Sequence, residues 1–139
     1  KDIFRMLVES IRPSHIYYFS SPRIKTNKDN ELDDILLNEC MKFYVKVFKY
    51  LAKTVSSFEK VKVFYPSTEY IDDNDNNFKE YILAKKAGES LCNELNAKYD
   101  KPRFIFERLP KVQTDQTQSF IQGTGEEATG LLINILRKL

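Results

Sequence analysis

Two residues of this chain, Tyr81 and Lys85, have the types and the spacing of a proton-transfer pair. Residues four apart lie on one face of a helix, one turn from each other, so a helix here would bring the two side chains together. An ammonium close to a phenol favours the phenolate and lowers the pKa of the tyrosine. The hydroxyl of Tyr81 would then exchange a proton more readily at neutral pH. Taken alone, the same spacing is more typical of a surface lysine beside a half-buried tyrosine.

A hydroxyl side chain precedes this pair. Ser67 lies fourteen positions before Tyr81, and Thr68 follows it directly. Residues 60–71, KVKVFYPSTEYI, alternate valine and aromatic residues before a proline, which predicts a strand. Ligands of α/β sheets bind at the carboxyl ends of the strands. A serine at this strand end could therefore hydrogen-bond a substrate oxygen next to Tyr81.

The spacing of apolar residues along the rest of the chain predicts alternating helices and strands. Because this order at these spacings is that of right-handed βαβ units, it indicates a parallel sheet with helices on its faces. After the last strand we expect a loop and then a short helix or an irregular apolar tail over 131–139. The expected helices are 2–12, 32–58 and 78–99, and the expected strands are 15–24, 60–71 and 103–112.

Composition excludes several classes of protein. The chain is 42% hydrophobic and 30% charged, which is sufficient for one compact domain over 1–139. Its 22 basic and 20 acidic residues are interspersed, so we expect neither a nucleic-acid partner nor a membrane partner. No apolar run approaches the ~18 residues of a membrane span, and residues 1–10 are not a secretory signal, so we expect a cytoplasmic protein. Cys40 and Cys92 are expected to be buried thiols, and the single histidine, His15, has no second metal ligand nearby.

With these motifs in this order, the chain resembles the catalytic, C-terminal half of the short-chain dehydrogenase/reductase family over essentially its whole length. The resemblance implies that Ser67 orients a carbonyl group, with Thr68 as a substitute one position closer to the tyrosine. It also implies that Tyr81 is the proton donor, and that Lys85 lowers the tyrosine pKa and holds the nicotinamide ribose. The implied cofactor is NAD or NADP.

The resemblance implies further contacts to the cofactor. Residues 108–114, RLPKVQT, look similar to the Arg-Pro-Gly-x-x-x-Thr turn of the family, which would bring Thr114 near the cofactor carboxamide. The strand end with Ser20 and Ser21 takes the place of the Asn-Asn-Ala-Gly segment beside the cofactor. RLPKVQTDQT also resembles atypical members appended to polyketide or nonribosomal peptide assembly proteins. The implied substrate is a small-molecule or carrier-bound carbonyl compound.

The chain departs from the family pattern at two positions of the site. Pro110 stands where the usual turn has a glycine. The helix asparagine of the usual catalytic tetrad has no secure counterpart, because the best alignment places Phe43 or Tyr44 there and Asn38 falls several residues early.

A further departure concerns the glycines. The chain has no glycine-rich turn after a first strand, since its four glycines are Gly88, Gly123, Gly125 and Gly130. Such a turn lets the backbone approach a pyrophosphate at a helix N-terminus. We therefore expect a Rossmann-like parallel sheet that lacks the N-terminal nucleotide-binding strands, and little dinucleotide binding by this chain alone.

Three functional hypotheses follow. The first is a carbonyl reductase or alcohol dehydrogenase whose first strands are supplied by another segment. The second is a non-catalytic module of a larger assembly, in which the Tyr81 motif is a relic and the aromatic helix 43–51 forms an interface. The third, a small flavodoxin-like domain, needs a phosphate loop at 20–27, SSPRIKTN, which is a poor match.

One expectation concerns assembly. A doubly wound sheet without its first half would leave strand 15–21 with an open hydrogen-bonding edge. We therefore expect this strand to pair with the missing N-terminal half or with a second copy, and the chain not to be a monomer.

Overall fold

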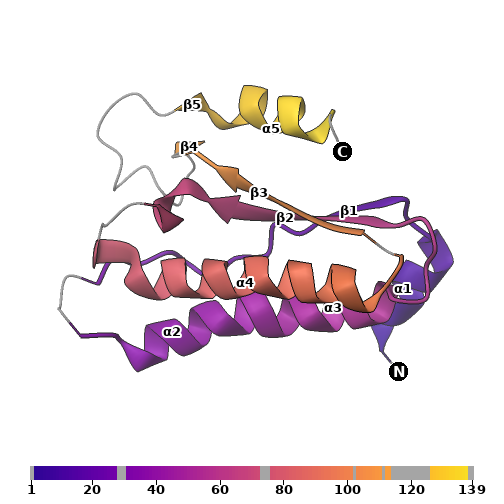
Figure 1. Ribbon diagram of the computed structural model, residues 1–139, viewed down its shortest axis with the longest axis horizontal. Helices are drawn as coiled ribbons and strands as arrows, with labels where there is room; N and C mark the ends of the chain where they lie inside the picture. Colours follow the sequence, from indigo (N-terminus) through magenta and orange to yellow (C-terminus); the bar gives the residue numbers. More distant parts are fainter. Residues whose placement is uncertain are drawn as a thin grey trace.

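The computed structural model describes residues 2–27, 31–72, 76–101, 103–110, 112–113 and 126–137. Its main sheet has three parallel strands in the order β1-β2-β3, formed by His15–Tyr17, Lys62–Thr68 and Arg103–Leu109. Figure 1 shows helices α2, α3 and α4 together on one face of this sheet, with α5 on the other side. The expected Rossmann-like α/β arrangement, a parallel sheet with flanking helices, is confirmed.

Strand β2 is the centre of the sheet. It pairs with β1 on one side and β3 on the other, and every residue from Val63 to Thr68 is buried. Continuous burial is what a parallel strand covered by helices shows. The register sets Ser67 of β2 directly beside Arg108 of β3, so the carboxyl ends of the two strands lie together.

Strand β1 differs from the expectation of a buried strand over 15–24. Regular pairing covers only residues 15–17, and His15 and Tyr17 are exposed. Tyr18 adds one more backbone hydrogen bond, to Phe64 O at 2.9 Å, and its side chain is buried. The strand is exposed because, among the described residues, it has a neighbour on one side only.

The helix expected over 32–58 is interrupted by a wider turn. It comprises α2 (Asp34–Met41), a π-helical turn η1 (Lys42–Val47) and α3 (Phe48–Val55). Asp33 caps its start by accepting hydrogen bonds from the backbone N–H groups of Ile35 and Leu36. π turns inside longer helices occur frequently at functional sites. Here the turn carries the buried side chain of Tyr44.

Helix α4 (Lys79–Lys98) follows two short 3₁₀ turns, η2 (Glu69–Ile71) and η3 (Asn76–Phe78). It packs against α2, η1 and strands β2 and β3. Its interior glycine, Gly88, is explained by Tyr65 of β2, because a Cβ at position 88 would overlap the tyrosine hydroxyl. The glycine therefore lets helix and strand approach closely, in spite of the ~1 kcal/mol by which it disfavours a helix interior.

The two ends of the chain are also helical. At the N-terminus, α1 (Ile3–Ile11) begins after the cap residue Asp2. Its C-terminal cap is Arg12, which has a left-handed φ of 49° just before Pro13.

Strand β3 stops at Leu109 rather than at 112, because Pro110 has no N–H to donate to a ladder.

At the C-terminus, β4 (Val112–Gln113) pairs in parallel with β5 (Glu126–Glu127). Helix α5 (Ala128–Leu136) starts three residues earlier than the expected apolar segment. None of the described helices combines the length and apolar character that a bilayer crossing requires.

Candidate active site

The first half of α4 faces the carboxyl end of β2. Lys85 is only 5% exposed, and its Nζ donates a hydrogen bond of 2.5 Å to the carbonyl oxygen of Pro66. One turn earlier, Tyr81 lies where the hydroxyl of Thr68 weakly lowers its pKa. The structure therefore brings Tyr81 and Lys85 together at the strand end.

Ser67 lies in the same place but has a different partner. Its hydroxyl is buried and donates a hydrogen bond of 2.6 Å to Oε1 of Glu89. Thr68, the next residue, is the one that acts on the pKa of Tyr81. Of the two strand-end hydroxyls that sequence considerations offered, Ser67 is therefore occupied by Glu89, and Thr68 is the one that influences the tyrosine.

The ammonium group of Lys85 lies among three tyrosine rings. Its Nζ is 4.1 Å from the ring centroid of Tyr44, 5.0 Å from that of Tyr65 and 5.6 Å from that of Tyr81. Within the described part of the chain it forms no ion pair with a carboxylate. Burial lowers the pKa of Lys85 to about 7, although Cys40 and Glu89 act on this pKa in the opposite direction. The rings therefore hold a lysine that loses its proton near neutral pH.

Burial is also the main influence on the pKa of Tyr81. It raises the pKa of the tyrosine to about 12, with the hydroxyl of Thr68 as a weaker opposing effect. The expected lowering by Lys85 does not dominate, because a lysine that is itself neutralised near pH 7 does little to stabilise a phenolate. At neutral pH Tyr81 is thus protonated, and its hydroxyl is a donor.

Tyr44 connects the end of β1 to this cluster. Its hydroxyl is 2.6 Å from Oγ of Ser21, and its ring makes an edge contact with Tyr81 at a centroid distance of 5.6 Å. Burial raises the pKa of Tyr44 far above that of a free tyrosine. Asn38 is exposed on α2, so Tyr44 is the residue of this helix that reaches Lys85.

The other residues predicted to contact the cofactor do not join Tyr81 and Lys85 directly. Ser20 is exposed just beyond the end of β1. Ser21 reaches the site only through Tyr44. Thr114 lies outside the described residues.

An ion-pair network that sequence reasoning missed surrounds Ser67. Arg108 contacts Glu89 with two parallel hydrogen bonds, Nε to Oε1 and Nη2 to Oε2, both 2.9 Å long. Its Nη1 contacts both carboxylate oxygens of Asp72, at 2.8 and 2.9 Å. One signal for Glu89 was present in the sequence, since it continues the four-residue spacing from Tyr81 through Lys85.

The start of α4 is fixed by Glu80, the neighbour of Tyr81. Glu80 is fully buried, and its Oε1 accepts hydrogen bonds from Nδ2 of Asn27 at 2.6 Å and the backbone N–H of Asp33 at 2.8 Å. These two residues belong to the segment between β1 and α2. Glu80 therefore anchors that segment to the turn of α4 that carries Tyr81.

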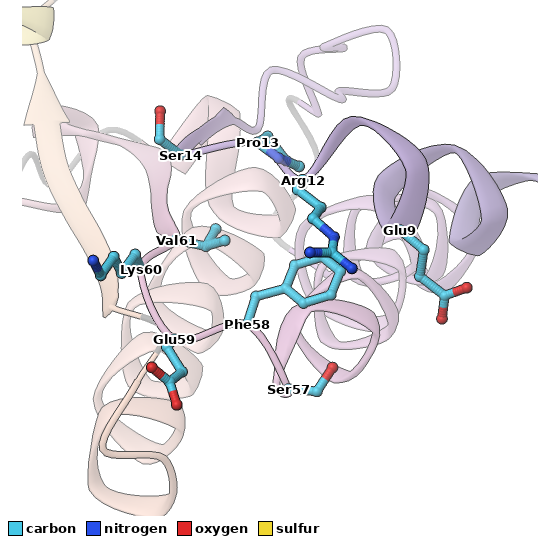
Figure 2. Close-up of a pocket in the computed structure, with 9 residues that line it drawn as sticks. All are labelled: Glu9, Arg12, Pro13, Ser14, Ser57, Phe58, Glu59, Lys60 and Val61. Carbon is cyan, nitrogen blue, oxygen red and sulfur yellow. The ribbon is translucent and has the colours of Figure 1, made fainter.

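A pocket of about 790 Å³ lies at the other end of the sheet, where the strands begin. Figure 2 shows it between the end of α1 and the turn before β2, with Arg12, Phe58, Glu59 and Lys60 among its lining residues. None of the residues around Tyr81 lines it. The candidate site and this pocket are therefore separate features.

Comparisons with known proteins identify the fold. No protein-family model and no curated protein sequence matches the chain. Among solved structures, it is similar to a short chain dehydrogenase from Salmonella enterica serovar Typhi, with a TM-score of 0.76 and 12% identity. A short chain dehydrogenase from Escherichia coli complexed with NADPH gives a TM-score of 0.76 at 13% identity. A 4-hydroxyisoleucine dehydrogenase complexed with NADH gives 0.70 at 13% identity.

These matches cover nearly all of this chain but a smaller share of each solved structure. The Salmonella and Escherichia structures each cover 95% of this chain, whereas the chain covers 60% of theirs. For the 4-hydroxyisoleucine dehydrogenase the shares are 96% and 64%. At such low identity the likeness carries the fold alone. Over nearly its whole length, this chain folds as about three-fifths of a short chain dehydrogenase does.

Proposed function

We propose that this chain is the catalytic part of an NAD(P)-dependent oxidoreductase of the carbonyl reductase or alcohol dehydrogenase type. The observation that carries the proposal is that Tyr81 and Lys85 lie one helical turn apart on α4 at the carboxyl end of β2, where Nζ of Lys85 is bonded to the Pro66 carbonyl. The NADPH and NADH complexes among the similar structures support a nicotinamide cofactor.

The chemistry assigned to the chain is proton transfer and orientation. A nicotinamide cofactor, when bound, supplies or accepts the hydride. Tyr81, which is protonated at neutral pH, donates its proton to a carbonyl oxygen in reduction. Thr68 hydrogen-bonds the same oxygen and so orients it. The raised pKa of about 12 keeps Tyr81 protonated at neutral pH, and it also makes the phenol a weaker acid than a free tyrosine.

The residues present fit only one end of such a cofactor. Ser20 and Thr68 offer polar groups for the nicotinamide end at the carboxyl ends of β1 and β2. Lys85 is enclosed by Tyr44, so it can reach a ribose only if that ring moves. The described residues before Gly88 include no glycine for a pyrophosphate turn. The described residues therefore do not fit the pyrophosphate of the cofactor.

A completing segment would supply that missing part. The proposed partner is an N-terminal nucleotide-binding half, or a second copy of the chain, and the proposed substrate is a small-molecule or carrier-bound carbonyl compound. Two features support a partner: β1 is paired on one side only within the described sheet, and α1 exposes apolar side chains. These exposed side chains are Ile3, Phe4, Met6, Leu7 and Ile11.

A second candidate function is a non-catalytic module of a larger assembly. One observation favours it: the ring of Tyr44 covers the ammonium of Lys85, and Tyr44 is itself a core residue that is 2% exposed. A lysine in this position stabilises a tyrosine cluster by cation–π contacts without any exchange with substrate. In that case the tyrosine and lysine would be structural residues.

Calorimetry and turnover separate the two candidates. The chain alone should bind NAD(H) and NADP(H) weakly, because it lacks the pyrophosphate turn, and micromolar affinity would show that the phosphate site has been misplaced. Together with its completing segment, the wild-type chain should oxidise a reduced cofactor in the presence of a carbonyl compound. A completed, folded protein without turnover on a panel of aldehydes and ketones would favour the module.

A further inference from the structure

One face of α4 holds the end of β2. Tyr81, Lys85 and Glu89 are four residues apart and form one stripe along the helix. Lys85 donates a hydrogen bond to the Pro66 carbonyl, and Glu89 accepts one from the Ser67 hydroxyl. Helix and strand are therefore fixed to each other at two successive residues, with Tyr81 one turn before them.

Glu89 is held in one orientation by Arg108. Both carboxylate oxygens receive a hydrogen bond from the guanidinium, in the parallel arrangement that gives the strongest geometry for this pair. Since Arg108 is the register partner of Ser67, the carboxylate is held between the ends of two neighbouring strands. The side chain of Glu89 is 10% exposed.

The charge of Glu89 decides what Ser67 can do. Burial raises the pKa of this carboxyl, but the hydrogen bonds from Arg108 and Ser67 outweigh it, so the pKa is lowered and the group is ionised at neutral pH. An ionised carboxylate only accepts hydrogen bonds, whereas a serine hydroxyl has a single proton to donate. That proton is directed to Glu89 at 2.6 Å. Ser67 therefore retains only acceptor capacity, and a carbonyl oxygen needs a donor.

We propose that Glu89 is a positioning residue of the site, which accepts the hydrogen bond of the Ser67 hydroxyl and leaves Thr68 as the strand-end hydroxyl that orients the substrate oxygen beside Tyr81. This inference rests on the proposed function and deepens it. Glu89 acts through Ser67 and through the placement of the helix, and it does not touch the substrate. Arg108 and Asp72 complete the network, with Arg108 anchoring the carboxylate and Asp72 contacting the outer side of the guanidinium.

The first arm of the test uses the chain itself. The carboxyl carbon of Glu89 is titrated by NMR in the wild type and in Ser67→Ala. Loss of a hydrogen bond to the ionised form should raise the pKa of Glu89. Arg108→Gln should raise it as well and serves as a second variant. Ser90→Ala is the matched control, because Ser90 is the exposed neighbour of Glu89 on the same helix and should leave the titration unchanged.

The second arm uses the completed protein. Thr68→Val should lower kcat at least ten-fold more than Ser67→Ala does, with Glu89→Gln affecting kcat more than KM. Equal losses in the two hydroxyl variants would overturn the inference. An unchanged Glu89 titration in Ser67→Ala would overturn it as well, whatever the activity. A shifted titration in a completed protein that has no turnover would instead overturn the proposed function.

Discussion

Tyr81 is the residue whose replacement tests the chemistry most directly. In the completed protein, Tyr81→Phe removes only the hydroxyl and should lower kcat by about 10²–10⁴-fold, the range for a lost general acid. Steady-state turnover measures this. Tyr50→Phe is the matched control, because Tyr50 is 45% exposed on α3 and its ring packs against Phe4 of α1. Equal rates in Tyr81→Phe and the wild type would rule out the tyrosine as proton donor.

Lys85 should make stability depend on pH. Its pKa is about 7 in the folded chain and returns to its ordinary value of 10.5 on unfolding. Between these values the unfolded chain binds more protons, so the free energy of unfolding should rise as the pH increases from 7 towards 10. Below pH 7 the lysine is charged in both states, and the full destabilisation remains, on the order of a few kcal/mol.

Lys85→Met should remove this effect. The variant should be more stable than the wild type at pH 7 and should lose the slope between pH 7 and 10. Urea unfolding at a series of pH values measures both quantities, and Lys86→Met on the exposed side of the same helix is the control. A wild-type chain whose stability is flat over this interval would show that the lysine keeps its proton in the fold.

At the scale of elements, the contact between α4 and β2 depends on Gly88. A methyl group there meets the fully buried ring of Tyr65, so Gly88→Ala should lower the free energy of unfolding by about 1–3 kcal/mol in spite of its better helix propensity. Gly130→Ala in α5 meets nothing within 4 Å and should be neutral or stabilising by up to ~1 kcal/mol. Denaturant unfolding compares the two.

The substitution Tyr65→Phe tests whether the tyrosine hydroxyl is the atom that a Cβ at position 88 would overlap. The hydroxyl of Tyr65 has no hydrogen-bond partner among the described residues, so its removal alone should be near neutral. Combined with Gly88→Ala, it should recover part of the lost stability, since the closest overlap is with that hydroxyl. Strict additivity of the two substitutions would mean that the helix and the strand adjust by another route.

Elements defined by local spacing were predictable from the sequence. The helices expected at 2–12 and 78–99 are observed at Ile3–Ile11 and Lys79–Lys98. The π turn at Lys42–Val47 was not predicted, because the apolar residues of 32–58 continue at helical spacing across it. Interruption by one wider turn depends on packing that the local pattern does not encode.

Within the candidate site, too, the contacts set by local spacing were predictable from the sequence, and those set by strand register were not. Tyr81 and Lys85 share one helix, so their spacing alone placed them together. The contact of Glu89 with Ser67 and Arg108 depends on the register of two strands, and no local pattern specifies that register. The pKa directions of Tyr81 and Lys85 follow from burial, which the spacing of two residues does not reveal.

At the scale of the whole molecule, the edge of β1 predicts association. The strand is paired only with β2 among the described strands, and it carries no proline or acidic residue to discourage a further neighbour. We expect residues 15–17 to pair with a strand from the completing segment or from a second copy. Light scattering should then report a particle larger than 16.4 kDa.

Hydrogen exchange provides the second measurement. Amides 16–18 should exchange more slowly at protein concentrations where the chain associates than at high dilution. A monodisperse particle of 16.4 kDa with freely exchanging amides in β1 would contradict the prediction and weaken the case for a missing neighbour. A substitution that places lysine at Tyr17, which is 40% exposed, should favour the monomer.

The tyrosine rings around Lys85 also give the protein an optical signal of its own. The chain has eight tyrosines and no tryptophan, so its near-ultraviolet absorption and fluorescence come mainly from tyrosine. Tyr44, Tyr65 and Tyr81 surround one ammonium, and the ring of Tyr18 stacks on that of Tyr65 with centroids 6.2 Å apart. Rings this close share excitation and respond to a charge in their midst. Titration of Lys85, or movement of Tyr44 away from it, should therefore change the emission and circular dichroism of the unlabelled chain.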